Sequence, residues 1–412
     1  MSMRKINTRS FRLATRSTPR EVNRQIVLNL IREHQPISRA ELARRMNVRR
    51  ASLTRIVREL LTAGDVEETG TAASARGRRP TLLRVRTSGR LAVAVDVRPG
   101  RTSVALADFG GQVLSRDGFA TPERPEALAS ELAARVNAIL GSQHAADCRG
   151  VGIVVPGMVD RRTGRVLYAP RLGWRNAHVT DVIVDQTTLP VYVESAPIAC
   201  ALARLWSLTG KTRAVNNFAY VSVSDGVGVG IVNRGEVLRG ETHTAGELGH
   251  VSLDPNGPQC ACGKRGCWEA FACNSATIAR YTAAVSNRST LPSPTRSRAT
   301  RSSAPTIEDV VRRALAGEQA AVDAIVETGH QVGRGLAAVV NAFNPKRIYV
   351  GGEVTAAWEL LEPQIRKALE EETLTDATRA TPVYADPNPA EYRLLGAIAL
   401  VAAPSFAAPR VG

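Results

Sequence analysis

The hydrophobic periodicity of this chain changes near Arg90, and the change divides the sequence into two parts of different architecture. Before Arg90, apolar residues recur every three or four positions, which is the spacing of helices. After it, apolar runs such as LAVAVDVR, TSVALADF and GVGIVVPG predict strands, with a helix over 125–140 between them. We therefore expect a small helical unit followed by a larger α/β domain.

Positive charge is concentrated in the first part. The formal net charge is +16, and residues 1–90 hold 21 Lys and Arg against 7 Asp and Glu. The remaining residues are close to neutral. A basic unit joined to a near-neutral domain indicates a polyanionic partner for the basic unit, and nucleic acid is the natural candidate.

Three short helices are expected within residues 21–86. An apolar stripe predicts the first over 21–34, Ser38 begins the second, which runs through Met46, and Gly64 ends the third. This is the pattern of a helix-turn-helix, whose third helix enters the major groove of DNA. The exposed face of that helix carries Arg49, Arg50, Ser52, Thr54, Arg55 and Arg58. The alternative interpretation is a solvated basic helix face.

The segment GTAASARGRRPTLLRV is expected to form a hairpin-like wing. Its tip combines a flexible glycine with Arg76, Arg78 and Arg79, a composition suited to the narrow minor groove of A·T-rich DNA. Residues 21–86 are thus predicted to be a winged helix-turn-helix that binds a double-stranded operator with A·T-rich flanks. The basic residues 1–20 are expected to be a flexible tail.

The second part is expected to form two lobes, over 91–200 and 201–390, with a C-terminal helix over 391–404 that packs back on the first lobe. The Ser-, Pro- and Arg-rich segment 287–304 is expected to be a flexible surface insertion. No apolar run approaches the roughly 20 residues of a membrane-spanning helix, and the N-terminus lacks the apolar centre of a secretory signal. A cytoplasmic protein without a membrane partner is expected.

Four side chains that can bind a metal lie close together in the sequence. His250 is followed by Cys260, Cys262 and Cys267. Three thiolates and one imidazole can complete a tetrahedral site with no open position, which predicts a structural Zn²⁺ in the loop 250–269. The alternative is a set of buried free thiols, and a disulfide is disfavoured in a reducing compartment.

With these motifs the chain resembles the ROK family of sugar kinases and repressors. The resemblance rests on the cysteine cluster ending in CWE and on APRLGW, DGVGVGIVNRGEVLRG and NPKRIYVGGEV. The N-terminal SRAELARRMNVRRASLTRIVRELLTAGDVEETG and RGRRP resemble the winged-helix half of the family's repressor branch. The resemblance implies a two-lobed, actin-like ATPase fold of the ribonuclease H-like, sugar kinase type. It also implies a sugar in the cleft, structural zinc, and homodimers or homotetramers.

Two departures from the family's kinase pattern argue against phosphoryl transfer. Family kinases follow a strand-ending Asp with a Gly-Gly-Thr turn whose amides approach ATP phosphates, whereas here Arg98 and Pro99 follow Asp96. The family's Asn-Asp pair, which includes the general base, corresponds to Ser195 and Ala196, and alanine cannot accept a proton. We expect no kinase activity, with a degenerate or moonlighting glucokinase-like sugar kinase as the alternative.

The resemblance also implies an effector site. Glu247, His250 and Glu269 match residues that bind sugar hydroxyls in the family, Gly157 matches a cleft-lining glycine, and Ser195 replaces a polar contact. The alternative role of the two glutamates is to orient the zinc loop. The expected function is a transcriptional regulator, a repressor of carbohydrate-metabolism genes whose operator binding responds to a sugar or sugar derivative. A DNA-binding protein without sequence preference is the remaining alternative.

Overall fold

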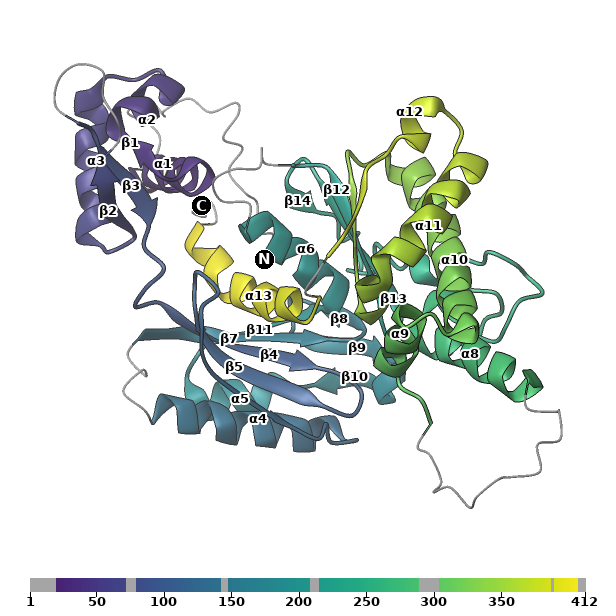
Figure 1. Cartoon of the computed structure of the whole chain (residues 1–412). Helices are drawn as coiled ribbons and strands as arrows, with labels where there is room; N and C mark the ends of the chain where they lie inside the picture. Colours follow the sequence, from purple (N-terminus) through teal and green to yellow (C-terminus); the bar gives the residue numbers. More distant parts are fainter. Residues whose placement is uncertain are drawn as a thin grey trace.

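The computed structural model describes residues 20–71, 79–141, 147–207, 215–288, 304–386 and 389–406. The expected basic tail up to residue 19, the wing residues Arg76 and Arg78, and most of the expected insertion 287–304 lie outside these residues, whereas Arg20 is the first residue of a helix. Figure 1 shows a small N-terminal unit beside a body built from two large sheets and a smaller three-stranded one, with helices between and around them. No helix within the described ranges is long and apolar enough to cross a membrane.

The N-terminal unit is a winged helix-turn-helix, as predicted. Its elements are α1 (Arg20–His34), β1 (Ile37–Ser38), α2 (Arg39–Met46), α3 (Arg50–Thr62), β2 (Val66–Thr71) and β3 (Thr81–Val85). The Ser38 hydroxyl accepts the backbone N–H of Glu41 at 3.1 Å, which caps α2. Asn47 adopts the left-handed conformation in the turn between α2 and α3, and Gly64 does so just after α3. The apolar stripes meet in one core that includes Leu30 and Leu53.

The first large sheet of the body has the strand order β11-β7-β4-β5-β6. We call this sheet, its helices and the separate three-stranded sheet β10-β9-β8 lobe 1. Its elements are β4 (Leu91–Val97), β5 (Thr102–Asp108), β6 (Val113–Phe119), α4 (Pro125–Leu140), β7 (Cys148–Val155), β8 (Met158–Asp160), β9 (Arg165–Ala169), β10 (Trp174–His178), α5 (Asp181–Thr187) and β11 (Val191–Ser195). The strands predicted over LAVAVDVR and TSVALADF are β4 and β5, and the helix predicted over 125–140 is α4. Strands β4, β5 and β6 pair antiparallel. Strands β7 and β11 continue the sheet in parallel.

The two faces of β4 explain its uninterrupted apolar sequence. Val93 and Val95 belong to the core that α4 and α5 cover. Ala92 and Ala94 face the opposite side, in a core shared with the C-terminal helix. Both faces of the strand are buried, and the small alanines leave room for a helix to approach the second face closely.

The second sheet has the order β14-β13-β12-β15-β16, and we call it and its helices lobe 2. Its elements are β12 (Phe218–Val223), β13 (Val227–Asn233), β14 (Glu236–Val237), α7 (Trp268–Ala272), α8 (Asn274–Arg288), α9 (Ile307–Leu315), α10 (Gln319–Phe343), β15 (Ile348–Gly351), α11 (Trp358–Glu372), α12 (Asp376–Arg379) and β16 (Val383–Ala385). Strand β12 pairs antiparallel with β13 and parallel with β15. Thr306 caps α9 with a complete capping box.

Two helices occupy the layer between the sheets (Figure 1): α6 (Ala196–Ser207) and α13 (Pro389–Ala402). Helix α13 packs on β4 and β7, and α6 packs on β12 and β13. The helices also pack on each other, and a Cβ atom on Gly396 would lie 2.4 Å from the Ala199 carbonyl oxygen. The lobe boundary expected at residue 200 therefore falls inside a helix that contacts both lobes.

Candidate functional site

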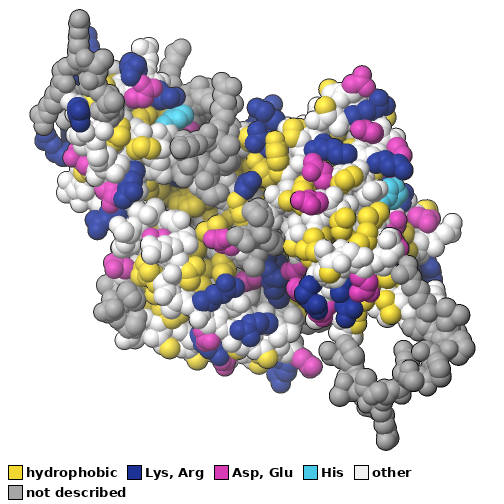
Figure 2. Space-filling view, in the orientation of Figure 1, with side chains coloured by type: hydrophobic (Ala, Val, Ile, Leu, Met, Phe, Trp, Pro, Cys, Tyr) yellow, Lys and Arg dark blue, Asp and Glu magenta, His cyan; other side chains and the backbone are white. Residues whose placement is uncertain are grey.

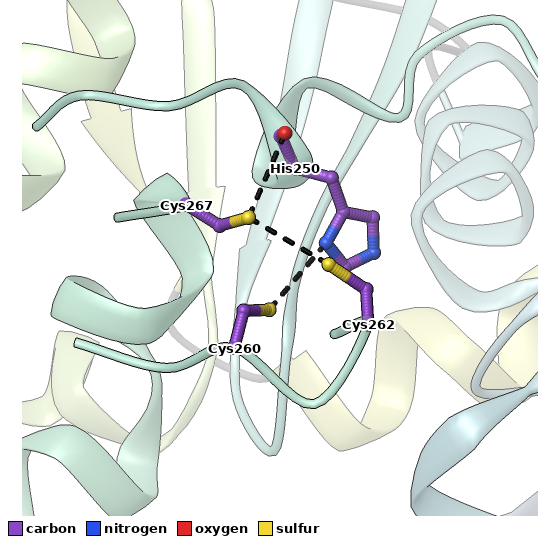
Figure 3. Close-up of side chains that lie close together, drawn as sticks. All are labelled: His250, Cys260, Cys262 and Cys267. Carbon is purple, nitrogen blue, oxygen red and sulfur yellow. Dashed lines mark hydrogen bonds between the residues drawn. The ribbon is translucent and has the colours of Figure 1, made fainter. Parts of the chain in front are cut away.

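The four predicted metal ligands converge in space. Their ligand atoms all lie within 4.8 Å of one another, and Figure 3 shows the side chains pointing toward one centre. His250 ends a short 3-10 helix, Leu248–His250, and Cys267 directly precedes α7. Cys260 Sγ lies 3.7 Å from His250 Nδ1, and Cys262 Sγ lies 3.7 Å from Cys267 Sγ.

These distances fit a tetrahedral metal ion. Metal–sulfur bonds of about 2.3 Å and metal–nitrogen bonds of about 2.0 Å give tetrahedral edges of about 3.5–3.8 Å. Burial raises the pKa of the Cys260 thiol to about 12, so a cation is needed to form its thiolate at neutral pH. The donor set and its geometry are compatible with a zinc site, whereas unrelated core thiols would not require four donors to converge.

A cleft opens between the lobes beside this cluster, with about 770 Å³ of empty space that includes its solvent-open mouth. All five predicted effector residues line it: Gly157, Ser195, Glu247, His250 and Glu269. They come from both lobes and from the segment that carries the metal cluster. A Cβ atom on Gly157 would lie 2.4 Å from the Tyr168 carbonyl oxygen, so only glycine fits that wall without a shift. The sequence-predicted residues are thus brought together in one site.

His250 and Glu269 link the cleft to the metal cluster. Whereas His250 Nδ1 faces Cys260, its Nε2 lies 3.9 Å from Glu247 Oε2. Glu269 Oε2 accepts the Val227 N–H at 3.0 Å, and its Oε1 lies 3.7 Å from Cys260 Sγ. Burial and the charge of Glu269 raise the pKa of Glu247 to about 7. Glu269 therefore contacts both β13 and the cysteine cluster while also lining the cleft.

The sequence did not predict the ion pairs at the floor of the cleft. Arg393 of α13 and Arg98, which follows β4, both line the cleft and both bind Asp96. Arg393 donates to Asp96 at 2.5 Å and to the Val97 carbonyl at 3.0 Å. Arg98 Nε lies 3.0 Å from the other Asp96 oxygen. Buried Asp96 is therefore held by two arginines. The sequence places Arg98 in the turn after Asp96 but does not predict that either arginine binds Asp96.

The second contact of Arg98 crosses to lobe 2. Its Nη1 donates to Glu353 Oε1 at 2.7 Å, while Glu353 Oε2 accepts from Ser224 at 2.7 Å and Asn274 at 2.9 Å. Burial raises the pKa of Glu353, but the hydrogen bonds from Asn274 and Ser224 outweigh it and hold the pKa below its ordinary value. Arg98 thus connects a carboxylate of each lobe.

The DNA-binding surface predicted on α3 is exposed. All six predicted side chains point to solvent: Arg49, Arg50, Ser52, Thr54, Arg55 and Arg58. Thr54 donates to the Arg50 carbonyl at 3.0 Å, and Arg55 pairs with Glu59 at 3.2 Å. Arg79 is exposed at the edge of the wing. Figure 2 shows Lys and Arg side chains around this unit, with few acidic side chains among them.

Residues 92–403 match the ROK family, and residues 25–69 match the MarR family. The chain belongs to the ROK family. The DNA-binding transcriptional dual regulator NagC of Escherichia coli (strain K12) and the N-acetylglucosamine repressor of Escherichia coli O6:H1 are each 28% identical over 390 residues, which are 93% of this chain and 92% of the relative. The xylose repressor of Caldicellulosiruptor bescii is 27% identical over 368 residues, 85% of this chain and 88% of the relative.

Solved ROK structures agree with this assignment. The crystal structure of a ROK family transcriptional regulator, a homologue of the E. coli MLC protein, matches with a TM-score of 0.76 at 29% identity. The match covers 94% of this chain and 97% of the other. This ROK regulator therefore has the predicted architecture, a MarR-type winged helix-turn-helix followed by the two-sheet ROK sugar-kinase fold.

Proposed function

We propose that this ROK family member is a cytoplasmic repressor of sugar-utilisation genes whose operator affinity changes when a sugar or sugar derivative enters the cleft. The carrying observation is that one chain joins an exposed basic recognition helix to a cleft lined by Glu247, His250 and Glu269. Carboxylates and an imidazole suit a polyol, because each hydroxyl both donates and accepts hydrogen bonds. The names of the relatives, xylose repressor and N-acetylglucosamine repressor, support a pentose or amino sugar as the effector.

The DNA partner is a double-stranded operator. Helix α3 would lie in the major groove, where Arg49, Arg50 and Arg58 reach guanine edges or phosphates, and the wing arginines would reach an A·T-rich minor groove. A homodimer or homotetramer would place two recognition helices on half-sites about one helical turn apart or a multiple of it.

The metal proposed for the cysteine cluster is a structural Zn²⁺ held by His250, Cys260, Cys262 and Cys267. The ion would supply folding energy to the loop 250–269 and leave no open coordination position for chemistry. The ion would also fix the positions of cleft residues, because the loop carries His250 and ends at Glu269.

The same cleft argues for regulation rather than phosphoryl transfer. Ala196, at the start of α6, cannot act as a general base. Arg98 pairs with Asp96 and Glu353, and it lies in the turn whose backbone would have to approach the phosphates of ATP. We propose that the chain lacks sugar kinase activity, and the degenerate kinase is the candidate against which this is tested.

A titration experiment tests the sugar-responsive function. An operator is selected from random duplexes with the zinc-loaded protein, and d-xylose, glucose, N-acetylglucosamine and their phosphates are titrated by calorimetry. We expect one of them to bind saturably and to weaken operator binding, and Glu247→Gln to reduce its affinity at least tenfold. Glu241→Gln, an exposed glutamate of the same segment outside the cleft lining, should not. Absence of binding by every sugar, or no effect on the operator complex, would refute the proposal.

A further inference from the structure

The winged helix-turn-helix is held to the body by a clamp of three side chains: Arg32, Trp206 and Phe406. Arg32 lies in the last turn of α1, and its guanidinium carbon is 5.3 Å from the Trp206 ring centre and 5.4 Å from that of Phe406. The two rings meet edge to face at 5.0 Å. One turn earlier on α1, the fully buried Asn29 donates to the Phe406 carbonyl at 2.9 Å.

The clamp is part of the core of the N-terminal unit. Trp206 and Phe406 pack against the same apolar cluster as the helices of that unit. Arg32 is only 9% exposed, and its Nε has no hydrogen-bond partner among the described residues. Both aromatic rings lie against this desolvated guanidinium, and cation–π attraction is stronger where water is excluded. The unit cannot leave the body without exposing this core.

Each ring belongs to one helix of the layer between the lobes. Trp206 lies in the last turn of α6, and Phe406 ends the 3-10 turn Ala403–Phe406 that directly follows α13. The indole N–H of Trp206 also donates to the Phe109 carbonyl of lobe 1 at 3.0 Å. The clamp is thus the place where α6, the end of α13 and lobe 1 meet the DNA-binding unit.

Both helices start at the cleft. Ala196 and Pro197, at the beginning of α6, line the cleft together with Ser195, the last residue of β11. Arg393, near the beginning of α13, lines it too. From Ala196 to Trp206 the helix advances about 15 Å at 1.5 Å per residue. One end of α6 therefore contacts the cleft and its other end contacts the clamp, without an intervening loop.

The contact between the helices favours sliding over bending. Gly396 brings α13 against the backbone of α6 at Ala199, and the Pro197 carbonyl of α6 lies 2.4 Å from where a Cβ atom on Gly230 of β13 would be. Backbones this close transmit displacement, because no flexible side chain lies between them. Small sliding motions of packed helices are a common mode of domain closure.

We propose that the clamp couples the orientation of the DNA-binding unit to the position of α6 relative to α13. Occupation of the cleft shifts lobe 2 and α6 against α13, which changes how Trp206 and Phe406 hold Arg32 and so reorients α3 toward DNA. Arg32 is a positioning residue for DNA recognition and does not contact DNA. The coupling rests on the proposed function, whereas the clamp itself does not.

The first experiment requires no sugar. Full-length Arg32→Met keeps an apolar stem in the clamp and removes the charge, and hydrogen exchange and small-angle X-ray scattering are compared with the wild type. We expect at least tenfold faster exchange in residues 403–406 and a larger maximum dimension. The link between Asp65 and Arg90 remains as a tether. Arg135→Met is the matched control, because Arg135 of α4 stacks on Phe119 of β6 within lobe 1 and takes no part in the contact between α6 and α13. Exchange and dimension equal to wild type in Arg32→Met would overturn the clamp.

The second experiment measures the coupling, using d-xylose and N-acetylglucosamine as probes. The ratio of operator Kd with and without sugar is expected at 5–150-fold in the wild type, the usual range of allosteric coupling, and near one in Arg32→Met. Sugar Kd by calorimetry should stay within about threefold of wild type, and Phe406→Trp should keep the ratio.

The outcomes separate the two proposals. A wild-type ratio retained in Arg32→Met would overturn the coupling role while leaving the proposed function intact. A wild-type protein whose operator binding ignores both sugars would refute the proposed response to these effectors and the coupling with it. The hydrogen exchange and scattering results would then be the only test of the clamp.

Discussion

The Arg98 guanidinium bridges the lobes by donating to Glu353 at 2.7 Å while its Nε lies 3.0 Å from Asp96. Asp96 lies in β4 of lobe 1, and Glu353 follows β15 of lobe 2, so the bridge joins the ends of two different sheets. A planar guanidinium can serve both carboxylates because its N–H groups point in different directions. The contact between the two lobes in this protein therefore includes an ion pair between its own side chains.

Removing the Arg98 side chain should loosen the two lobes. Arg98→Ala leaves Glu353 partly buried with only its lobe 2 partners, and a cost of about 2 kcal/mol is expected for a buried charge that loses one partner. Calorimetry should show a lower melting temperature, and X-ray scattering a larger radius of gyration. Arg101→Ala, at an exposed position of the same turn, should change neither.

A double-mutant cycle assigns that effect to the bridge. If the pair acts as a unit, Glu353→Gln should add little to Arg98→Ala, and the coupling energy should be about 1 kcal/mol or more. Strict additivity of the two changes, or an unchanged radius in Arg98→Ala, would contradict the bridge as the link between lobes.

The metal cluster predicts a defined stoichiometry. Purified protein should contain one zinc per chain by mass spectrometry of the metal, and Cys262→Ser should lose it together with part of the thermal stability. Cys148→Ser alters a buried thiol of lobe 1 far from the cluster in sequence and should keep the metal. Metal-free wild type that is as stable as zinc-loaded protein would contradict a structural ion.

Contacts of α3 with DNA should separate by their salt dependence. Arg50→Ala removes an exposed arginine at the start of α3, and at least tenfold weaker operator binding is expected. A contact to phosphate lowers the salt slope by about one, whereas a contact to guanine relaxes sequence preference at one position. Arg116→Ala on β6 of lobe 1 is the control. Equal operator affinity in Arg50→Ala and wild type would exclude this residue from the interface.

We expect no kinase activity even when a carboxylate is introduced at position 196. Ala196→Asp places a potential base at the start of α6, yet Arg98 and Pro99 remain in the turn after β4. We expect no sugar-dependent ADP release from the wild type or from this variant in a coupled assay. Sugar-dependent turnover by the wild type would instead identify a kinase.

Local patterns predicted much of the fold. The helix over 125–140, the Ser38 cap and the metal cluster all depend on residues within one or two turns or one loop, where spacing determines which side chains meet. The effector residues were located through family motifs, and the structure brings them into one cleft.

Long-range pairings could not be predicted in this way. Arg98 and Glu353 are 255 positions apart, and Arg393 is 297 positions from Asp96. In a chain with 54 basic side chains, charge alone cannot select the partner of any one arginine. The clamp on Arg32 was missed for the same reason, since Phe406 lies at the other end of the sequence. The boundary expected at residue 200 lies within α6, and apolar periodicity alone does not show that this helix contacts both lobes.

The two nitrogen atoms of His250 have a consequence for the polarity of the cleft. When Nδ1 is a metal ligand, the proton of the neutral ring resides on Nε2, which then can only donate. Beside it, 3.9 Å away, Glu247 only accepts when ionised, but its pKa of about 7 means that near neutral pH it also exists as a protonated carboxyl group that donates. The cleft therefore presents one donor of fixed identity beside a carboxyl group whose hydrogen-bonding character changes with pH, and above pH 7 the pair suits a hydroxyl group, which both accepts and donates.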